Sequence, residues 1–166
     1  EGARKAWEAF QEDAKTRGLT ILDAEEAERA QGCAAAVRDK ASAYIAPSKG
    51  RAEIPITWTD AETGLVCKSR LDWLTINRVL VELKSTRSTD ERNFANQAWK
   101  LGYFHAQMFY SMGVASATGC TIEEVPLLFV AVESEPPYDV ALFEPCEETQ
   151  DPTCGVPTNR QVPRAI

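Results

Sequence analysis

The sequence predicts an α/β (α+β) fold in which helices flank a mixed β-sheet that contains a three-stranded antiparallel meander. Two helical patterns come first, and three strand-like stretches with short turns between them fill residues 52–86. Helical spacing returns over residues 90–114, and two further apolar stretches with strand character follow. Helices placed before and between groups of strands can cover both faces of one sheet.

The two expected N-terminal helices have recognisable ends. The first covers residues 3–17 and stops at Gly18, and its apolar residues recur at helical spacing (Ala3, Trp7, Phe10 and Ala14). The second begins at Asp23, a capping residue with Glu26 three positions later, which is the spacing of a capping box. Its apolar side extends to Tyr44, and the sequence APSKG closes it.

The next three stretches predict the meander. AEIPITWT (52–59) alternates apolar and polar residues, which is the period of a strand. LVCKSRLDWL (65–74) and RVLVELKST (78–86) follow, with the turn sequences DAETG and TIN between them. Connections this short make neighbouring strands antiparallel. Pro55 indicates that the first strand lies near a sheet edge, because proline donates no hydrogen bond to a ladder.

The C-terminal half is expected to hold one long helix and two strands. The helix covers residues 90–114, with Gly102 as a possible point of bending, and the strands are PLLFVAVES and YDVALFE around an EPP turn. The sequence from Pro145 onward is acidic and contains prolines. We therefore divide the chain into one domain, 1–145, and a loop or tail, 146–166.

Charge is unevenly distributed along the chain. The net charge of −7 argues against a nucleic-acid partner, because contacts to phosphate need lysine and arginine. Residues 68–100, however, have a local balance of +3, and the remainder carries −10. Such a band fits a confined polyanion site, and a solvated face of mixed charge is the alternative. Its basic residues are Lys68, Arg70, Arg78, Lys84, Arg87, Arg92 and Lys100.

The composition also bounds the compartment. No apolar run reaches the roughly 18 residues that a membrane-spanning helix requires, and the amino terminus lacks the apolar core of a signal peptide. We therefore expect a cytoplasmic protein without a membrane partner. The five cysteines are an odd number without C-x-x-C spacing, so we interpret them as free thiols rather than disulfides or metal ligands.

Three charged residues interrupt the apolar runs of the meander: Asp72, Glu82 and Lys84. Glu82 and Lys84 are two positions apart and project from the same face of their strand, and Asp72 comes beside Glu82 if the register allows. Adjacent carboxylates repel unless a cation lies between them, and oxygen ligands suit Mg²⁺ or Mn²⁺. Glu53, on the first strand, can supply a third carboxylate.

A metal ion at such a site activates water for attack on a phosphodiester. Lys84 can orient that water or stabilise the charge that develops on the phosphate. The chain has no P-loop and no G-x-G-x-x-G, and its single histidine does not allow a catalytic triad to be assembled. The alternative is that the acid-x-Lys triplet forms only a surface salt bridge, which is its usual role in a chain this rich in charge.

These residues resemble a known family. LD at 71–72 followed by ELK at 82–84 looks like the PD-(D/E)XK nuclease superfamily, which has a restriction-endonuclease-like core. The blocks AEIPITWTDAETGLVCKSRLDWL, VLVELKSTRS and GYFHAQMFYSMG, in this order, resemble the RecE-type (exodeoxyribonuclease VIII-like) phage and prophage exonucleases. The resemblance extends from about residue 7 to residue 144.

The resemblance implies roles for the charged residues. Asp72, Glu82 and the carbonyl group of Leu83 would hold the metal. Lys84 would be the catalytic lysine, and Glu53 matches an upstream acidic position. Many relatives also carry a metal-binding histidine on an upstream helix, whereas the histidine here, His105, lies downstream. That role is therefore missing or is filled by an upstream acid, although a solvated first helical turn explains the same acids more simply (Glu25, Glu26 and Glu28).

The third block is similar to a Gln–Tyr motif that contacts DNA in relatives. Tyr110 keeps the tyrosine, whereas Gln107 is one position too close to it and Ala106 occupies the expected glutamine position. We carry Tyr110 and Gln107 over as DNA-binding candidates. Three residues of the basic band are added to them: Lys100, Arg87 and Arg70.

The expected function is that of a metal-dependent exonuclease that degrades linear duplex DNA in phage-type recombination, in a bacterial or phage-infected cell. The resemblance implies a homo-oligomer, a trimer or tetramer, and a single-strand annealing recombinase is a candidate partner. Two alternatives stay open. One is a structure-specific endonuclease or nickase on the same core, and the other is a catalytically idle DNA-binding module.

Overall fold

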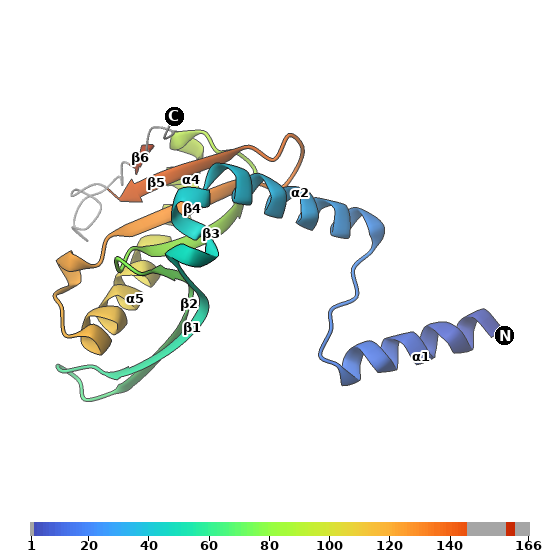
Figure 1. Cartoon of the computed structure of the whole chain (residues 1–166), viewed down its shortest axis with the longest axis horizontal. Coiled ribbons are helices and arrows are strands. Elements are labelled where there is room, and N and C mark those ends of the chain that lie inside the picture. Colours follow the sequence, from blue (N-terminus) through green and yellow to red (C-terminus); the bar gives the residue numbers. More distant parts are fainter. Residues whose placement is uncertain (1, 146–158, 162–166) are drawn as a thin grey trace.

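The computed structural model describes residues 2–145 and the backbone of residues 159–161. Within these residues, six strands form one sheet in the order β1-β2-β3-β4-β5-β6. The pairing of β3 with β4 is parallel and the other pairings are antiparallel. Helices cover both faces of the sheet (Figure 1). The predicted mixed sheet with an antiparallel meander is therefore confirmed.

The N-terminal helices begin as predicted. Helix α1 (Gly2–Thr16) projects away from the body of the molecule, and α2 (Ala24–Lys40) lies along the sheet (Figure 1). Asp23 caps α2 through a capping box: its carboxylate accepts a hydrogen bond from the Glu26 backbone N–H at 2.8 Å, and the Glu26 carboxylate accepts one from Asp23 at 3.0 Å.

The second helix ends earlier than the sequence predicted. After Ala41, the chain forms the short helix α3 (Ser42–Ile45) and the 3-10 turn η1 (Pro47–Lys49) before it enters the sheet. Ala41 is fully buried, so the chain changes direction there against the core, and helical periodicity does not record this turn.

The meander consists of β1 (Gly50–Thr59), β2 (Val66–Thr75) and β3 (Leu80–Thr86). Among the described residues β1 pairs only with β2, so Pro55 lies on an edge strand as predicted. The β1–β2 ladder is long, whereas β2 and β3 pair only at Trp73 with Val81 and at Leu74 with Leu80. On the side of Trp73 that leads to Asp72, and of Val81 that leads to Glu82, the pairing stops and the two strands diverge.

The predicted long helix is two helices, α4 (Glu91–Lys100) and α5 (Tyr103–Thr118). Gly102 separates them with a left-handed φ of 67°, a conformation that glycine adopts without steric cost. The two helices form the crossover that parallel strands require, leading through η2 (Ile122–Glu124) to β4 (Leu127–Glu133). Gly102 therefore ends a helix rather than bending one.

Strand β5 (Val140–Pro145) forms where the sequence predicted a strand, and it pairs with β4. The short strand β6 (Asn159–Gln161) pairs with β5 and lies in the segment expected to be loop, 146–166. A three-residue strand gives too short a pattern to be recognised in a sequence that contains prolines. The rest of the expected tail lies outside the described residues, and the proposed division at residue 145 stays a prediction.

Two apolar layers hold the helices on the sheet. On one face, Val37 and Ala41 pack on Val81 and Val130. On the other face, α4 and α5 pack through a group of aromatic residues that contains Phe94, Phe104, Phe129 and Phe143. Because side chains alternate along β3, Leu80 and Glu82 face α5 whereas Val81 faces α2.

In the part of the chain that the structure describes, no helix combines the length and the apolar character needed to cross a membrane.

Candidate active site

The candidate active site lies where β2 and β3 diverge. The ladder partner of Asp72 would be Glu82, but the backbone pairing stops one residue earlier. The Asp72 side chain fills the opening: its Oδ2 accepts a hydrogen bond from the backbone N–H of Leu83 at 3.0 Å. A carboxylate thus replaces the backbone carbonyl that would otherwise pair with β3, and Asp72 is fixed beside the Glu82–Lys84 segment.

Glu82 and Lys84 form a buried ion pair. Lys84 Nζ lies 2.8 Å from Glu82 Oε2, and the Glu82 side chain is only 3% exposed. The second oxygen, Oε1, is buried and has no hydrogen-bond partner in the described part of the chain. An unpaired carboxylate oxygen in an interior is costly, and an ion or a water molecule is the usual explanation for one.

A polar network from α4 and α5 supports Lys84. Its ammonium group lies 5.0 Å from the centre of the Tyr103 ring, within the range of a cation–π contact. Gln97 Nε2 donates to Tyr103 Oη and to the Ser85 carbonyl, both at 3.2 Å, and Gln97 Oε1 accepts from Thr86 Oγ1 at 2.9 Å. The sequence prediction gave Tyr103 and Gln97 no role, because only the packing of the helices brings them to Lys84.

The pKa values of the pair reflect its surroundings. Burial raises the pKa of Glu82 above its usual value. The hydrogen bond from Lys84 opposes this rise, and the negative charge of Asp72 adds to it. Burial by itself lowers the pKa of Lys84, but the hydrogen bond to Glu82 and the charges of Glu82 and Asp72 outweigh it, so that pKa is raised. Lys84 therefore remains an ammonium ion at neutral pH.

Glu53 lies across from Asp72 on the neighbouring strand. Ala52 pairs with Trp73 and Ile54 with Leu71, so Glu53 and Asp72 face each other where the ladder skips a pair. Glu53 also has a left-handed φ of 52°, which is uncommon for a residue with a side chain and is often found at functional sites. Its carboxylate lies 2.9 Å from the guanidinium group of Arg70, and both side chains are mostly exposed.

The donor set fits a hard divalent cation. Asp72 and Glu82 offer carboxylate oxygens and Leu83 a backbone carbonyl, which are the ligands that Mg²⁺ and Mn²⁺ prefer. The unpartnered Oε1 of Glu82 is a free ligand position. Among the described residues, no group of three or more His, Cys, Asp or Glu side chains converges, and Glu53 pairs with Arg70. A third ligand would come from the backbone, from water, or from Glu53 after it leaves Arg70.

The predicted DNA-binding residues differ in exposure and in their contacts. Lys100 and Arg87 are exposed, at the end of α4 and just after β3. Arg70 is engaged by Glu53. Tyr110 is half-buried against the core cluster that contains Leu71 and Leu80.

Gln107 lies in the interior, and this placement corrects the expectation that it contacts DNA directly. It is 1% exposed, and neither its Nε2 nor its Oε1 has a partner in the described chain. The residue is on the buried side of α5, between Phe104 and Ser111, where contact with a polymer outside the protein is blocked. The motif resemblance does not register this burial, because it depends on how α5 packs on the sheet.

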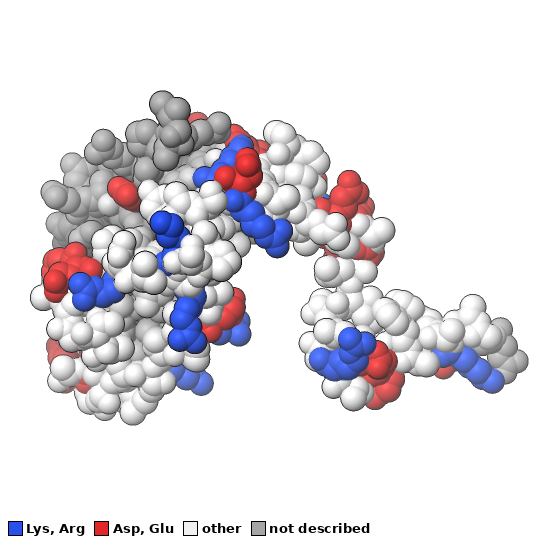
Figure 2. Space-filling view, viewed as in Figure 1, with Lys and Arg blue, Asp and Glu red and all other residues white. Residues whose placement is uncertain are grey.

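The upstream acids and the histidine make contacts of their own outside the three charged site residues. Glu26 belongs to the capping box of α2, and Glu25 lies 3.8 Å from Arg29. Figure 2 shows acidic side chains gathered at the end of α2 nearest α1, and charges of both signs interspersed over the body. His105 is exposed, with its ring centre 6.4 Å from that of Trp99.

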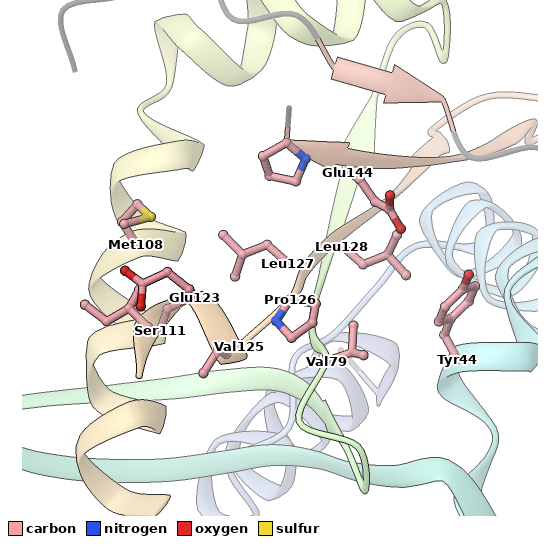
Figure 3. Close-up of a pocket in the computed structure, with 12 residues that line it drawn as sticks. Tyr44, Val79, Met108, Ser111, Glu123, Val125, Pro126, Leu127, Leu128 and Glu144 are labelled. Atoms are coloured by element: carbon pink, nitrogen blue, oxygen red, sulfur yellow. The ribbon is translucent and has the colours of Figure 1, made fainter. Parts of the chain in front are cut away.

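Two cavities in the body differ in their relation to the site. One, of about 610 Å³, is lined by Glu53, Asp72 and Leu83 together with residues of α2, α3 and η1. The other, of about 300 Å³, lies on the side of Met108, Ser111 and Glu123, and none of the three charged site residues lines it (Figure 3). Only the larger cavity opens onto the candidate active site.

A mixed sheet with an antiparallel meander, and two carboxylates and a lysine where two of its strands diverge, define a nuclease-like domain of the PD-(D/E)XK type. The chain belongs to the family described as the PDDEXK-like domain of unknown function (DUF3799), whose model matches residues 4–152. No curated protein matches the sequence.

The fold is similar to that of a crystal structure from Eubacterium rectale, of a protein provisionally described as an exonuclease. The TM-score is 0.58 and the sequence identity 18%, and the match covers 88% of this chain. The chain spans 55% of the length of that protein, so the likeness concerns the shared fold.

Proposed function

We propose that this domain is a Mg²⁺- or Mn²⁺-dependent deoxyribonuclease that hydrolyses phosphodiester bonds of linear duplex DNA. One observation carries the proposal: Glu82 is buried, its Oε2 bonds to Lys84, and its Oε1 has no partner among the residues that the structure describes. A surface salt bridge does not explain a carboxylate that is 3% exposed and half satisfied. In metal-assisted hydrolysis, Oε1 of Glu82 binds the metal and Oε2 holds Lys84 beside it.

The residues have distinct roles in this reaction. Asp72, Glu82 and the Leu83 carbonyl hold the ion, and Glu53 is a further ligand when its ion pair with Arg70 opens. When bound, a divalent ion supplies a Lewis acid and lowers the pKa of bound water. Lys84, held by Glu82 and Tyr103, orients the attacking water and stabilises the charge that develops on the phosphate.

Exonuclease action is the form that the charge distribution favours. Nonspecific affinity for duplex comes from neutralised phosphates, and the basic band of this acidic chain holds only seven lysines and arginines, spread from Lys68 in β2 to Lys100 at the end of α4. The domain therefore holds internal duplex weakly and depends on capture of an end, with Lys100, Arg87 and Tyr110 as candidate contacts. The sequence resemblance to RecE-type exonucleases supports the same reading.

The same resemblance supports the wider biological proposal. A ring-like trimer or tetramer would pool the basic residues of several subunits around one DNA strand. Its setting would be recombination in the cytoplasm of a bacterial or phage-infected cell, with a single-strand annealing recombinase as partner. Light scattering measures the oligomeric state directly.

Incubation with end-labelled linear duplex and with covalently closed circles, with and without Mg²⁺, tests the function. We expect rapid loss of the linear duplex only with metal, and little action on the circles. Asp72→Ala and Glu82→Ala, shown to be folded by circular dichroism, should be inactive. If closed circles are cut as fast as linear DNA, the protein is an endonuclease on the same core. A parent protein that binds DNA without any metal-dependent cleavage is an idle DNA-binding module.

A further inference from the structure

The larger cavity has a wall that metal coordination does not explain. Its apolar residues come from helices α2 and α3 and from the neighbouring strands: Val37, Ile45, Trp73, Val81, Leu83 and Val130. Hydrated cations and phosphate groups gain nothing from such a surface, because burial in an apolar environment costs a charged group its solvation. A volume of about 610 Å³ is within the range of sites that hold small organic molecules.

The rim of the cavity joins this wall to the candidate active site. Asp72 and Glu53 line it, and so does Leu83, whose N–H bonds to Asp72. Whatever fills the cavity therefore lies beside Asp72 and Glu53, two of the proposed metal ligands. Arg38 of α2 also lines the rim, is exposed, and makes no hydrogen bond or ion pair with another described residue. A free guanidinium group at this position suits a phosphate oxygen.

We propose that this cavity seats the base of an unpaired nucleotide next to the scissile phosphate, with Arg38 on a flanking phosphate. The proposal rests on the nuclease function above and specifies its substrate as a frayed or single-stranded end. A base within a stacked duplex is enclosed by its neighbours, so it must leave the stack before it enters the cavity. Trp73 and the aliphatic wall accept every base, because each base has an apolar π face.

Binding of mononucleotides tests the cavity without DNA cleavage. In the presence of Mn²⁺, calorimetry compares deoxyadenosine 5′-monophosphate with deoxyribose 5-phosphate, which has the same phosphate but no base. We expect the parent to bind the nucleotide at least about fivefold more tightly. Arg38→Gln should weaken both ligands by a similar factor, because the guanidinium group serves the phosphate. Equal binding of the two ligands by the parent overturns the proposal.

A substitution that fills the cavity tests whether the preference for the nucleotide arises there. Ala46 lines the cavity and has an extended backbone before Pro47, a conformation that phenylalanine adopts readily. Ala46→Phe should abolish the preference for the nucleotide and leave Mn²⁺ affinity unchanged. Ala43→Phe, on an exposed position of α3 outside the cavity, is the matched control and should keep the preference. Ser42→Tyr is a second filling variant if Ala46→Phe does not fold.

Two further outcomes are decisive. With DNA, the parent should prefer a duplex with three unpaired terminal nucleotides over one whose last base pair is cross-linked, and Ala46→Phe should lose this preference. If Ala46→Phe keeps its nucleotide preference, or changes only the oligomeric state in light scattering, the cavity holds something else and the proposal fails. A parent that cuts no DNA overturns the nuclease function, while the mononucleotide comparison still decides the role of the cavity.

Discussion

Oδ2 of Asp72 lies 3.0 Å from the backbone nitrogen of Leu83 and accepts its hydrogen bond. One side chain therefore both closes the gap between β2 and β3 and presents a charge to the site. The structural and chemical contributions of Asp72 can be separated by substitution, because an amide oxygen can accept the same hydrogen bond without carrying a charge.

Asp72→Asn should keep the fold and lose function. Its amide oxygen still accepts from Leu83, so we expect the free energy of unfolding, measured with urea, to change by less than about 1 kcal/mol. Nuclease activity should fall at least about a hundredfold, because a charged ligand is lost. Asp72→Ala also leaves the Leu83 N–H without its partner and should cost a further 1–3 kcal/mol or so. Equal stability of the two variants would show that the hydrogen bond is not structural.

Lys84→Ala should bind metal and turn over poorly. An ammonium group near the scissile phosphate acts on charge formed in the transition state, so its loss should reduce kcat about 10²- to 10³-fold. Calorimetry should show that Mn²⁺ binding is retained. Lys84→Arg is the informative control: the planar guanidinium group does not replace a compact ammonium held over Tyr103, and we expect it not to restore kcat. Full activity of Lys84→Ala would show that the ion pair of Lys84 with Glu82 is only structural.

The affinity for Mn²⁺ should rise with pH through the pKa of Glu82. Metal binds the carboxylate form, so protons compete below this pKa, which burial raises above the usual glutamate value. Affinity should level off once Glu82 is ionised. Lys84→Ala removes the hydrogen bond and the positive charge that lower this pKa, so the rise should move to higher pH. Calorimetry over a series of pH values measures both midpoints, and identical midpoints would exclude Glu82 as the titrating ligand.

Gly113→Ala should destabilise the contact between α5 and β1. A Cβ atom at this position would lie 2.6 Å from Ile56 Cδ1 and 2.7 Å from the Trp58 ring. Alanine is the better helix former by about 1 kcal/mol, but overpacking at a buried contact typically costs about 1–3 kcal/mol. We expect a lower free energy of unfolding in urea. Gly2→Ala, where a Cβ would meet nothing within 4 Å, is the control and should not be destabilised.

Sequence periodicity predicted the parts of the fold that depend on local pattern. The strands of the meander, the Asp23 cap and the edge position of Pro55 follow from residues that are neighbours in the chain. The break at Gly102 was read as a bend, because a pattern does not specify a left-handed φ. The end of α2 depends on where Ala41 meets the sheet, which is a long-range contact.

For the candidate site too, the sequence predicted what depends on local pattern and missed what depends on long-range contacts. The placement of Asp72 beside Glu82 required only a register between adjacent strands. The partners of the site come from distant segments: Tyr103 reaches Lys84 only because α5 crosses the sheet, and Arg70 reaches Glu53 only through the β1–β2 register. The burial of Gln107 likewise depends on which side of α5 packs on the strands.

The short ladder between β2 and β3 has a dynamic consequence. Strand β3 is held by β4 along its whole length but pairs with β2 at two positions only, so the backbone of β2 near Asp72 is held less firmly than that of β4, although Leu71 and Ile56 keep the hairpin packed on α5. We expect the amide hydrogens of β2 to exchange with deuterium earlier than those of β4. An ion held jointly by Asp72 and Glu82 would fasten the hairpin to β3, so Mn²⁺ should slow exchange in β2 and leave β4 unchanged. Binding of the ion would then also fix the position of β2 relative to β3.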